Sequence, residues 1–178
     1  FIPTEEPARV QIPPTPDLAE MIGDYKGRAA VAMGEKFDVS PENIDARIQR
    51  SKLESGLVVV ILPKKTRGGT FDLRLTLRFG DVESMNGKAG VIRLLGSMLS
   101  RGTTNRTRQQ IRDELDKYRA KMLFTSSPGS LTCIVQGTKE SLIPILDLLG
   151  DTIRNPAFPE SELETLRQQY LAGLEQQL

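Results

Sequence analysis

Positions 93, 96 and 97 are spaced so that suitable side chains there could bind a metal ion and activate water. They hold Arg93, Gly96 and Ser97. Apolar residues recur around them at helical spacing, which predicts a helix with a broad buried face: Val91, Leu94, Leu95 and Met98. Histidines at 93 and 97 would project side by side and grip one metal ion, while a carboxylate at 96 would activate water. Arginine has no lone pair to donate and a neutral serine hydroxyl is a poor zinc ligand. The residues present therefore predict a packing helix with a polar edge.

The composition excludes several classes of function. The chain has 178 residues, of which 38% are hydrophobic, enough for one buried core with an extension. Lys and Arg number 24 against 23 Asp and Glu, so the charge balance indicates neither nucleic acid nor an anionic membrane as a partner. Aromatic residues are 5% and tryptophan is absent, which argues against a base-stacking platform. No apolar run approaches the roughly 20 residues of a transmembrane helix.

Histidine is absent from the chain, and cysteine occurs once. The first fact excludes an imidazole base and any His-ligated metal site within these residues. Cys133 lies in an apolar alternation and is expected to be a small buried hydrophobe. The alternative, a reactive thiol, would need a neighbour that lowers its pKa, and no histidine is available. One cysteine forms no internal disulfide, so the redox compartment is not indicated.

Residues 1–45 differ in composition from residues 46–178. Five prolines favour extended backbone in the first part and predict a linker between domains: Pro3, Pro7, Pro13, Pro14 and Pro16. Within it, only residues 18–25 suggest a short helix, and Ser40 followed by Pro41 suggests one helical turn. The chain begins without methionine or a signal-like apolar core, so we expect a segment of something longer.

The second part has a regular order of strands and helices. Strands are predicted over 46–53 and 57–62 around a Gly56 turn, and over 71–79, where apolar and polar residues alternate. Thr107 and Gln110 form a capping box for a helix to about residue 118. The later elements are strands 122–125 and 130–136, helix 142–153, and a helix opened by Pro159 with a buried stripe of Leu163, Leu166, Tyr170 and Leu174. This order indicates an α+β fold with a largely antiparallel sheet covered on one face by helices.

The predicted helix around Arg93 resembles the zinc helix of the pitrilysin/insulinase-like metallopeptidases, the inverzincins. In that family, positions 93 and 97 carry the two zinc-binding histidines of His-x-x-Glu-His, and position 96 carries the glutamate that activates water. Four further phrases resemble the family in the same order and extend the likeness over about residues 50–178: Leu53–Val59, Phe79–Ser84, Arg108–Leu115 and Asn155–Pro159. The resemblance implies a degenerate, processing-peptidase-like domain that is truncated before its final strand.

The resemblance also places a third zinc ligand, a glutamate, on the last predicted helix. An ungapped count lands near Gly173, with Leu166 earlier on the helix, and only a shifted alignment reaches Glu175. A lone carboxylate facing arginine and serine is not a zinc site. Glu175 is therefore expected to be a solvated helix residue, and no metal or other cofactor is expected in this segment.

By resemblance, the chain is a non-catalytic domain of a zinc endopeptidase. Active members work as two halves, one holding zinc and one a degenerate copy that closes a chamber around the substrate. The expected partners are the catalytic half, on the same polypeptide or a partner subunit, and an extended peptide along a sheet edge. The resemblance implies a periplasmic or secreted location. The alternative is a structural scaffold subunit of the same family without proteolytic activity.

Three other features were weighed as sites. The first is a basic stretch that contains Arg101, Arg106, Arg108 and Arg112. It could bind a carboxylate or phosphate. The alternative is a solvated start of a helix, whose positive charge is balanced by Asp113, Glu114 and Asp116. A nucleic-acid role for these arginines would require a steeply salt-dependent affinity. The loop at 67–70 lacks the spacing of a phosphate-binding loop. Asp72 and Glu83 flank one predicted strand without forming an acid–base pair.

Overall fold

The structure is a computed structural model that describes residues 17, 23, 27 and 30–176. The chain divides into two compact units, Phe1–Ala30 and Val31–Leu178. Most of the helix predicted over residues 18–25 lies outside the described residues. The linker predicted over residues 1–45 stays a prediction.

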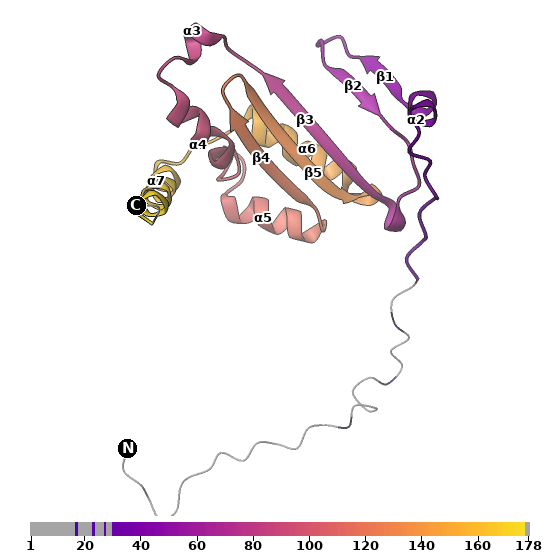
Figure 1. The fold of residues 1–178 in the computed structure, drawn as a ribbon. Helices are drawn as coiled ribbons and strands as arrows, with labels where there is room; N and C mark the ends of the chain where they lie inside the picture. The colour runs from indigo at the N-terminus through magenta and orange to yellow at the C-terminus, as the bar shows by residue number, and fades with distance from the viewer. Residues whose placement is uncertain (1–16, 18–22, 24–26, 28–29, 177–178) are drawn as a thin grey trace, which may run out of the picture. The chain divides into compact units, whose positions relative to one another are not determined.

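A three-stranded antiparallel sheet forms the centre of the second unit (Figure 1). Its strands are β3 (Thr70–Arg78), β4 (Lys121–Ser127) and β5 (Ser130–Thr138), in the order β3-β5-β4. Leu75 lies opposite Cys133, which lies opposite Phe124 on the other side. Alternate residues point to opposite faces of a strand, so this register gathers the apolar side chains of all three strands on one face.

Helices cover that apolar face and leave the other face open. They are α4 (Ala89–Leu99), α5 (Arg108–Lys117) and α6 (Leu142–Arg154). The core joins Leu99 of α4, Ile111 of α5 and Leu148 of α6 to the inward residues of β4 and β5. On β5 buried residues alternate with more accessible ones. The α+β prediction, with an antiparallel sheet covered on one face, is confirmed.

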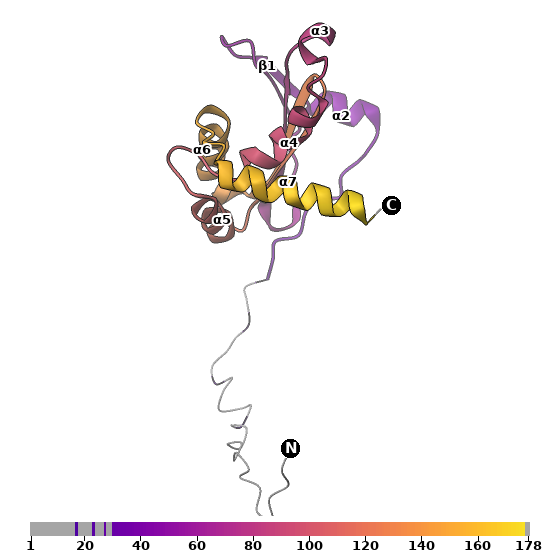
Figure 2. The same ribbon diagram turned by 90° about the vertical axis from the view of Figure 1, so that its left-hand side faces the viewer.

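The last helix, α7 (Glu160–Glu175), packs against α4, and in Figure 2 its C-terminal end extends beyond α4, α5 and α6. The predicted buried stripe on this helix is wrong for most of its length. Leu166 is 5% exposed, whereas Leu163, Tyr170 and Leu174 are 40%, 39% and 57% exposed. Apolar spacing identified a side of the helix that, within the described residues, is covered only around Leu166.

A second, two-stranded antiparallel sheet precedes the central one. It consists of β1 (Gln49–Lys52) and β2 (Val58–Ile61), joined through a turn in which Gly56 has a φ of 86°. The prediction that the first strand begins at Ala46 is wrong, because α2 (Pro41–Arg47) includes that residue. Proline at the first helical position favours this helix. Arg47 then forms a 2.8 Å ion pair with Glu35.

Shorter elements connect the sheets and helices. A 3-10 turn at Arg67–Gly69 leads into β3, helix α3 (Val82–Met85) precedes α4, and a 3-10 turn at Lys139–Ser141 precedes α6. The predicted capping box of Thr107 and Gln110 is present at the start of α5. A second box, between Asp81 and Ser84, opens α3.

Cys133 is 1% exposed in the core, as expected for a small buried hydrophobe. Its burial raises the pKa of the thiol to about 12, which keeps it protonated at neutral pH. A search of the described residues for a helix long and apolar enough to cross a membrane finds none.

Candidate functional site

The three positions singled out in α4 face different surroundings. Arg93 is exposed and Ser97 is partly buried, as expected for two residues one helical turn apart on a polar edge. Gly96 is buried. The structure therefore keeps Arg93 and Ser97 on the accessible side of α4 and turns position 96 toward the sheet.

Gly96 is the point at which α4 comes closest to β4. A Cβ atom added there would lie 3.1 Å from the Ser126 backbone nitrogen and 3.2 Å from the Phe124 carbonyl oxygen. These two neighbours are backbone atoms of β4, which is paired with β5, so they cannot swing aside as a side chain can. Glycine at this position permits the close packing, and a glutamate would require the helix and strand to separate.

Ser126 closes the same contact with hydrogen bonds, and sequence reasoning missed it. Its Oγ accepts from the N–H of Gly96 at 2.9 Å and donates to the carbonyl oxygen of Ile92. The hydroxyl thus bridges a backbone donor and acceptor one helical turn apart on α4. Nothing in the local sequence signals this bridge, because 30 residues separate Gly96 from Ser126.

A cavity of about 520 Å³ lies beside Arg93. It is lined by the start of α4 and by the turn that joins β4 to β5: Ala89, Gly90, Arg93, Ser126, Ser127 and Pro128. The Oγ atoms of Ser127 and Ser130 are 2.9 Å apart and hydrogen bonded. Guanidinium and hydroxyl groups can donate hydrogen bonds to a carbonyl or carboxylate, but they neither bind zinc nor remove a proton from water.

A zinc ion does not fit the residues at these positions. No cluster of three His, Cys, Asp or Glu side chains suited to a metal is found among the described residues. Glu175 lies exposed at the end of α7, as predicted, and Leu166 is buried. Arg93, Gly96 and Ser97 offer no strong zinc ligand, and Ser126 lies against Gly96.

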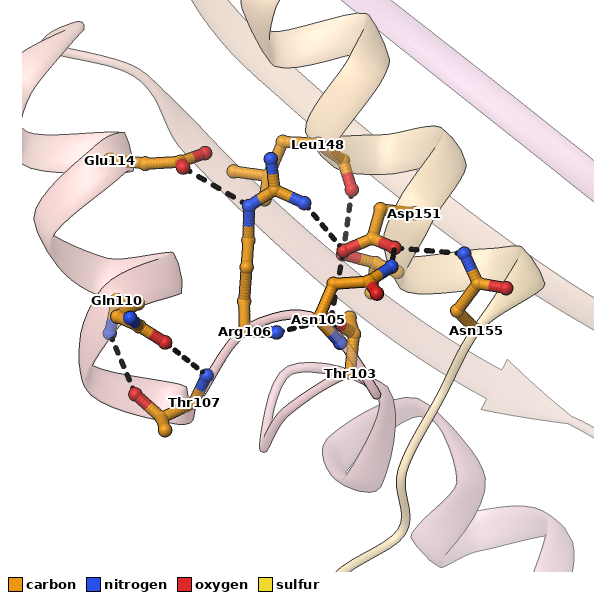
Figure 3. A network of polar contacts seen from close by, with 10 residues as sticks. Thr103, Asn105, Arg106, Thr107, Gln110, Glu114, Leu148, Asp151 and Asn155 are labelled. Carbon is orange, nitrogen blue, oxygen red and sulfur yellow. Dashed lines mark hydrogen bonds and ion pairs between the residues drawn. The ribbon is translucent and has the colours of Figure 1, made fainter.

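A polar network centred on Asp151 links helix α6 to the loop that follows α4 (Figure 3). The Asp151 carboxylate accepts hydrogen bonds from four side chains, Thr103, Asn105, Arg106 and Asn155, at 2.6–2.9 Å. Partial burial acts to raise the pKa of Asp151, but the four hydrogen bonds outweigh it and hold the pKa well below its usual range. The network fastens the loop after α4 to the C-terminal end of α6.

Most arginines of the basic stretch form ion pairs. Arg106 also contacts Glu114 at 3.0 Å. Arg101 and Arg108 both reach Glu162 of α7, at 2.7 and 3.1 Å. Asp113, Glu114 and Asp116 were expected to balance the charge of these arginines, and of the three only Glu114 forms a salt bridge with one of them. A cavity of about 780 Å³ opens beside the stretch, but carboxylates already neutralise three of its arginines.

The remaining candidates take structural roles. Asp72 accepts a 2.6 Å hydrogen bond from Gln136 on the neighbouring strand. Glu83 is exposed in α3. The residues at 67–69 form a short turn before β3, in which Gly68 has a φ of 71°.

Comparison with known proteins agrees with this geometry. The model of the insulinase family of peptidases, family M16, matches residues 59–177, which is most of the chain. The chain belongs to peptidase family M16. It is 27% identical over 113 residues to the mitochondrial-processing peptidase subunit alpha-1 of Dictyostelium discoideum, a match that covers 64% of this chain and 17% of that protein.

Two solved structures share the fold. A peptidase M16 inactive domain from Pseudomonas fluorescens superposes with a TM-score of 0.61 and 22% identity, covering 73% of this chain and 32% of that one. A protease from Helicobacter pylori gives a TM-score of 0.57 and 20% identity, covering 68% and 29%. The chain thus spans less than a third of either structure.

Membership of family M16 agrees with the resemblance described for the α4 sequence and covers residues 59–177. At the positions that resemble the family's His-x-x-Glu-His, the chain has Arg93, Gly96 and Ser97, and the backbone of β4 lies against Gly96.

Proposed function

We propose that this chain is a non-catalytic domain of a pitrilysin-like zinc endopeptidase, and that it closes the substrate chamber against the zinc-bearing half. The observation that carries the proposal is the α4–β4 contact. The zinc-helix frame is kept and well packed, while Gly96 and Ser126 occupy the place where a catalytic carboxylate would act. A domain that keeps the family's fold but lacks zinc ligands is better suited to enclosing the substrate chamber than to catalysis.

The zinc in this proposal belongs to the catalytic half, on the same polypeptide or on a partner subunit. The coverage of the relatives supports such an arrangement, since this chain matches only 17% of the processing-peptidase subunit. We place the assembled enzyme in the periplasm or outside the cell, an assignment that rests on the family resemblance alone.

The contact with substrate in this proposal runs along β4. This strand is at one edge of the sheet order and lies beside α4. An extended peptide can add to such an edge through its backbone, with side chains accepted by adjacent cavities. Arg93 lines the cavity next to the end of β4 and would donate hydrogen bonds to a peptide carbonyl or carboxylate.

A direct test measures zinc and peptidase activity of the purified chain, alone and with its catalytic half. Alone, it should bind no stoichiometric zinc by elemental analysis and cleave no unstructured peptide. With the catalytic half, Arg93→Glu should raise the KM for an extended peptide while leaving zinc content unchanged; Arg112→Glu, on the exposed side of α5, serves as the matched control. Chelator-sensitive cleavage by the chain alone would sink the proposal.

The second candidate is a structural scaffold subunit. The similarity to one subunit of a processing peptidase supports this alternative. The same experiment separates the two. A scaffold forms its complex normally, but no subunit of that complex carries an intact His-x-x-Glu-His, and peptide cleavage is absent throughout.

A further inference from the structure

Three lysines come together near the start of β3, outside the basic stretch around Arg106. Lys64 and Lys65 lie between β2 and β3, Lys139 lies in the 3-10 turn before α6, and the pairing of β3 with β5 brings the two segments together. All three residues are exposed, and none forms a salt bridge within the described part of the chain. The Lys64 ammonium lies 5.2 Å from the centre of the Phe37 ring, a contact that leaves its charge unneutralised.

The same lysines line one cavity of about 450 Å³. The turn before β3 forms another part of its wall, and apolar side chains contribute the rest: Ala32, Met33, Phe71 and Leu142. None of the described residues that line the cavity carries a carboxylate. Its volume lies within the range of ligand sites in proteins. The cavity thus combines three positive charges with an apolar wall.

The carboxylates next to this cavity do not neutralise its charge. Glu35 accepts two hydrogen bonds from the Arg47 guanidinium, at 2.8 and 3.0 Å, and a third from the backbone N–H of Lys65 at 3.0 Å. These bonds hold the Glu35 carboxylate on Arg47. Glu140 follows Lys139 in the chain, but it does not line the cavity and forms no salt bridge with any described residue. The three ammonium groups are therefore available to a ligand.

We propose that this cavity, the lysine cavity, binds an acidic segment of a partner polypeptide. Glutamate or aspartate carboxylates of that segment would contact the three ammonium groups, and an apolar side chain between them would lie against Met33 and Phe71. Like charges held close together repel, so an anionic partner is favoured by the attraction it gains and by the repulsion it relieves. Met33 is 82% exposed, and such a partner would cover it.

The charge of the lysine cavity separates this ligand from other occupants. A further strand of the same domain would pair through uncharged backbone N–H and C=O groups, which leave three ammonium groups without a counter-charge. A nucleic acid is negatively charged, but it is bound through aromatic stacking or a long basic track. The lysine cavity offers three lysines and a half-buried Phe71. The inference does not rest on the proposed chamber-closing role, because neither Arg93 nor β4 takes part.

The test measures binding of an acetylated, amidated peptide, three glutamates alternating with two leucines, to the whole chain by isothermal titration calorimetry. Lys65→Glu and Lys139→Glu together should weaken binding by about tenfold or more, because each change turns an attraction into a repulsion. Lys88→Glu, at an exposed position where α4 begins, is the matched control and should leave the affinity unchanged. On binding, backbone amide resonances of residues 64–71 and 139–142 should shift, whereas those of residues 89–97 should not.

Other outcomes would overturn the proposal. Equal binding of a peptide with glutamine in place of glutamate would show that charge is not recognised. Loss of binding in Arg93→Glu, with binding retained in the double lysine variant, would place the peptide at the cavity beside α4. A tenfold gain in affinity when Glu5, Glu6 and Glu20 are changed together to glutamine would make the first part of this chain the occupant. Tighter binding of single-stranded DNA, lost in the double lysine variant, would make a nucleic acid the ligand.

Discussion

The two edges of the central sheet differ in how they are covered. At the β4 edge, α4 lies so close that a Cβ added at Gly96 would meet β4 backbone atoms at 3.1 and 3.2 Å, and Ser126 bridges helix and strand. At the β3 edge, apolar residues are half-buried and the neighbouring hairpin exposes most of its apolar run. Within the described residues, α4 thus closes the face of the sheet at its β4 edge, the closed edge, whereas the face at its β3 edge, the open edge, is loosely covered.

The difference lies in what each side of the sheet packs against. At position 96 the helix sits directly on backbone atoms of β4, and a glycine permits that distance. At the open edge, apolar side chains of β2 are exposed within the described residues, and an unpaired apolar strand invites association.

The largest effect is expected from placing a glutamate side chain at the closed edge. Gly96→Glu should destabilise the chain by about 4 kcal/mol, because the side chain collides with β4 and buries a charge. Gly90→Glu is the matched control, since a Cβ at Gly90 meets no atom within 4 Å and a carboxylate suits the first turn of a helix. Urea unfolding of both variants measures the difference. Equal stability of the two would show that the α4–β4 contact is looser than described.

A smaller loss is expected at the network that ties the end of α4 to α6. Asp151→Asn should cost about 2 kcal/mol, because it removes the charge that Arg106 and three other donors share. Asp113→Asn, at an exposed position, is the control and should cost less than about 0.5 kcal/mol.

The Asp151 prediction has a pH signature. The folded pKa of Asp151 is depressed, so its stabilisation is fully present above the unfolded pKa of about 4 and is lost as pH falls below it. The unfolding free energies of the wild-type chain and Asp151→Asn should therefore differ at neutral pH and converge in strong acid. A constant difference over the whole range would assign the effect to packing alone.

Local signals in the sequence predicted much of the fold. The Thr107–Gln110 capping box, the alternation through β3 and the proline after Ser40 each depend on residues a few positions apart, and the structure contains all three features. Helical spacing and the M16 resemblance both pointed to Arg93, Gly96 and Ser97. The structure places these residues on α4, as predicted, and their correspondence to the family's zinc-site positions stays a prediction.

Long-range contacts could not be predicted in this way. Ser126 acts on Gly96 from a different strand, and Asp151 collects donors from a loop more than 40 residues earlier in the chain. The α7 stripe was wrong for the related reason that apolar spacing identifies a face but not its cover. The same limit applies to β2, whose apolar run predicted a strand but not an exposed edge.

The smallest effect is expected at the open edge, and it gives the sharpest comparison with the core. Val60→Ala should change stability by less than about 0.5 kcal/mol, because Val60 is 56% exposed. The same truncation at Val135, which is 1% exposed on β5, should cost about 2.5 kcal/mol. Urea unfolding of both variants measures the two losses. Equal losses would mean that Val60 is covered in solution as fully as Val135.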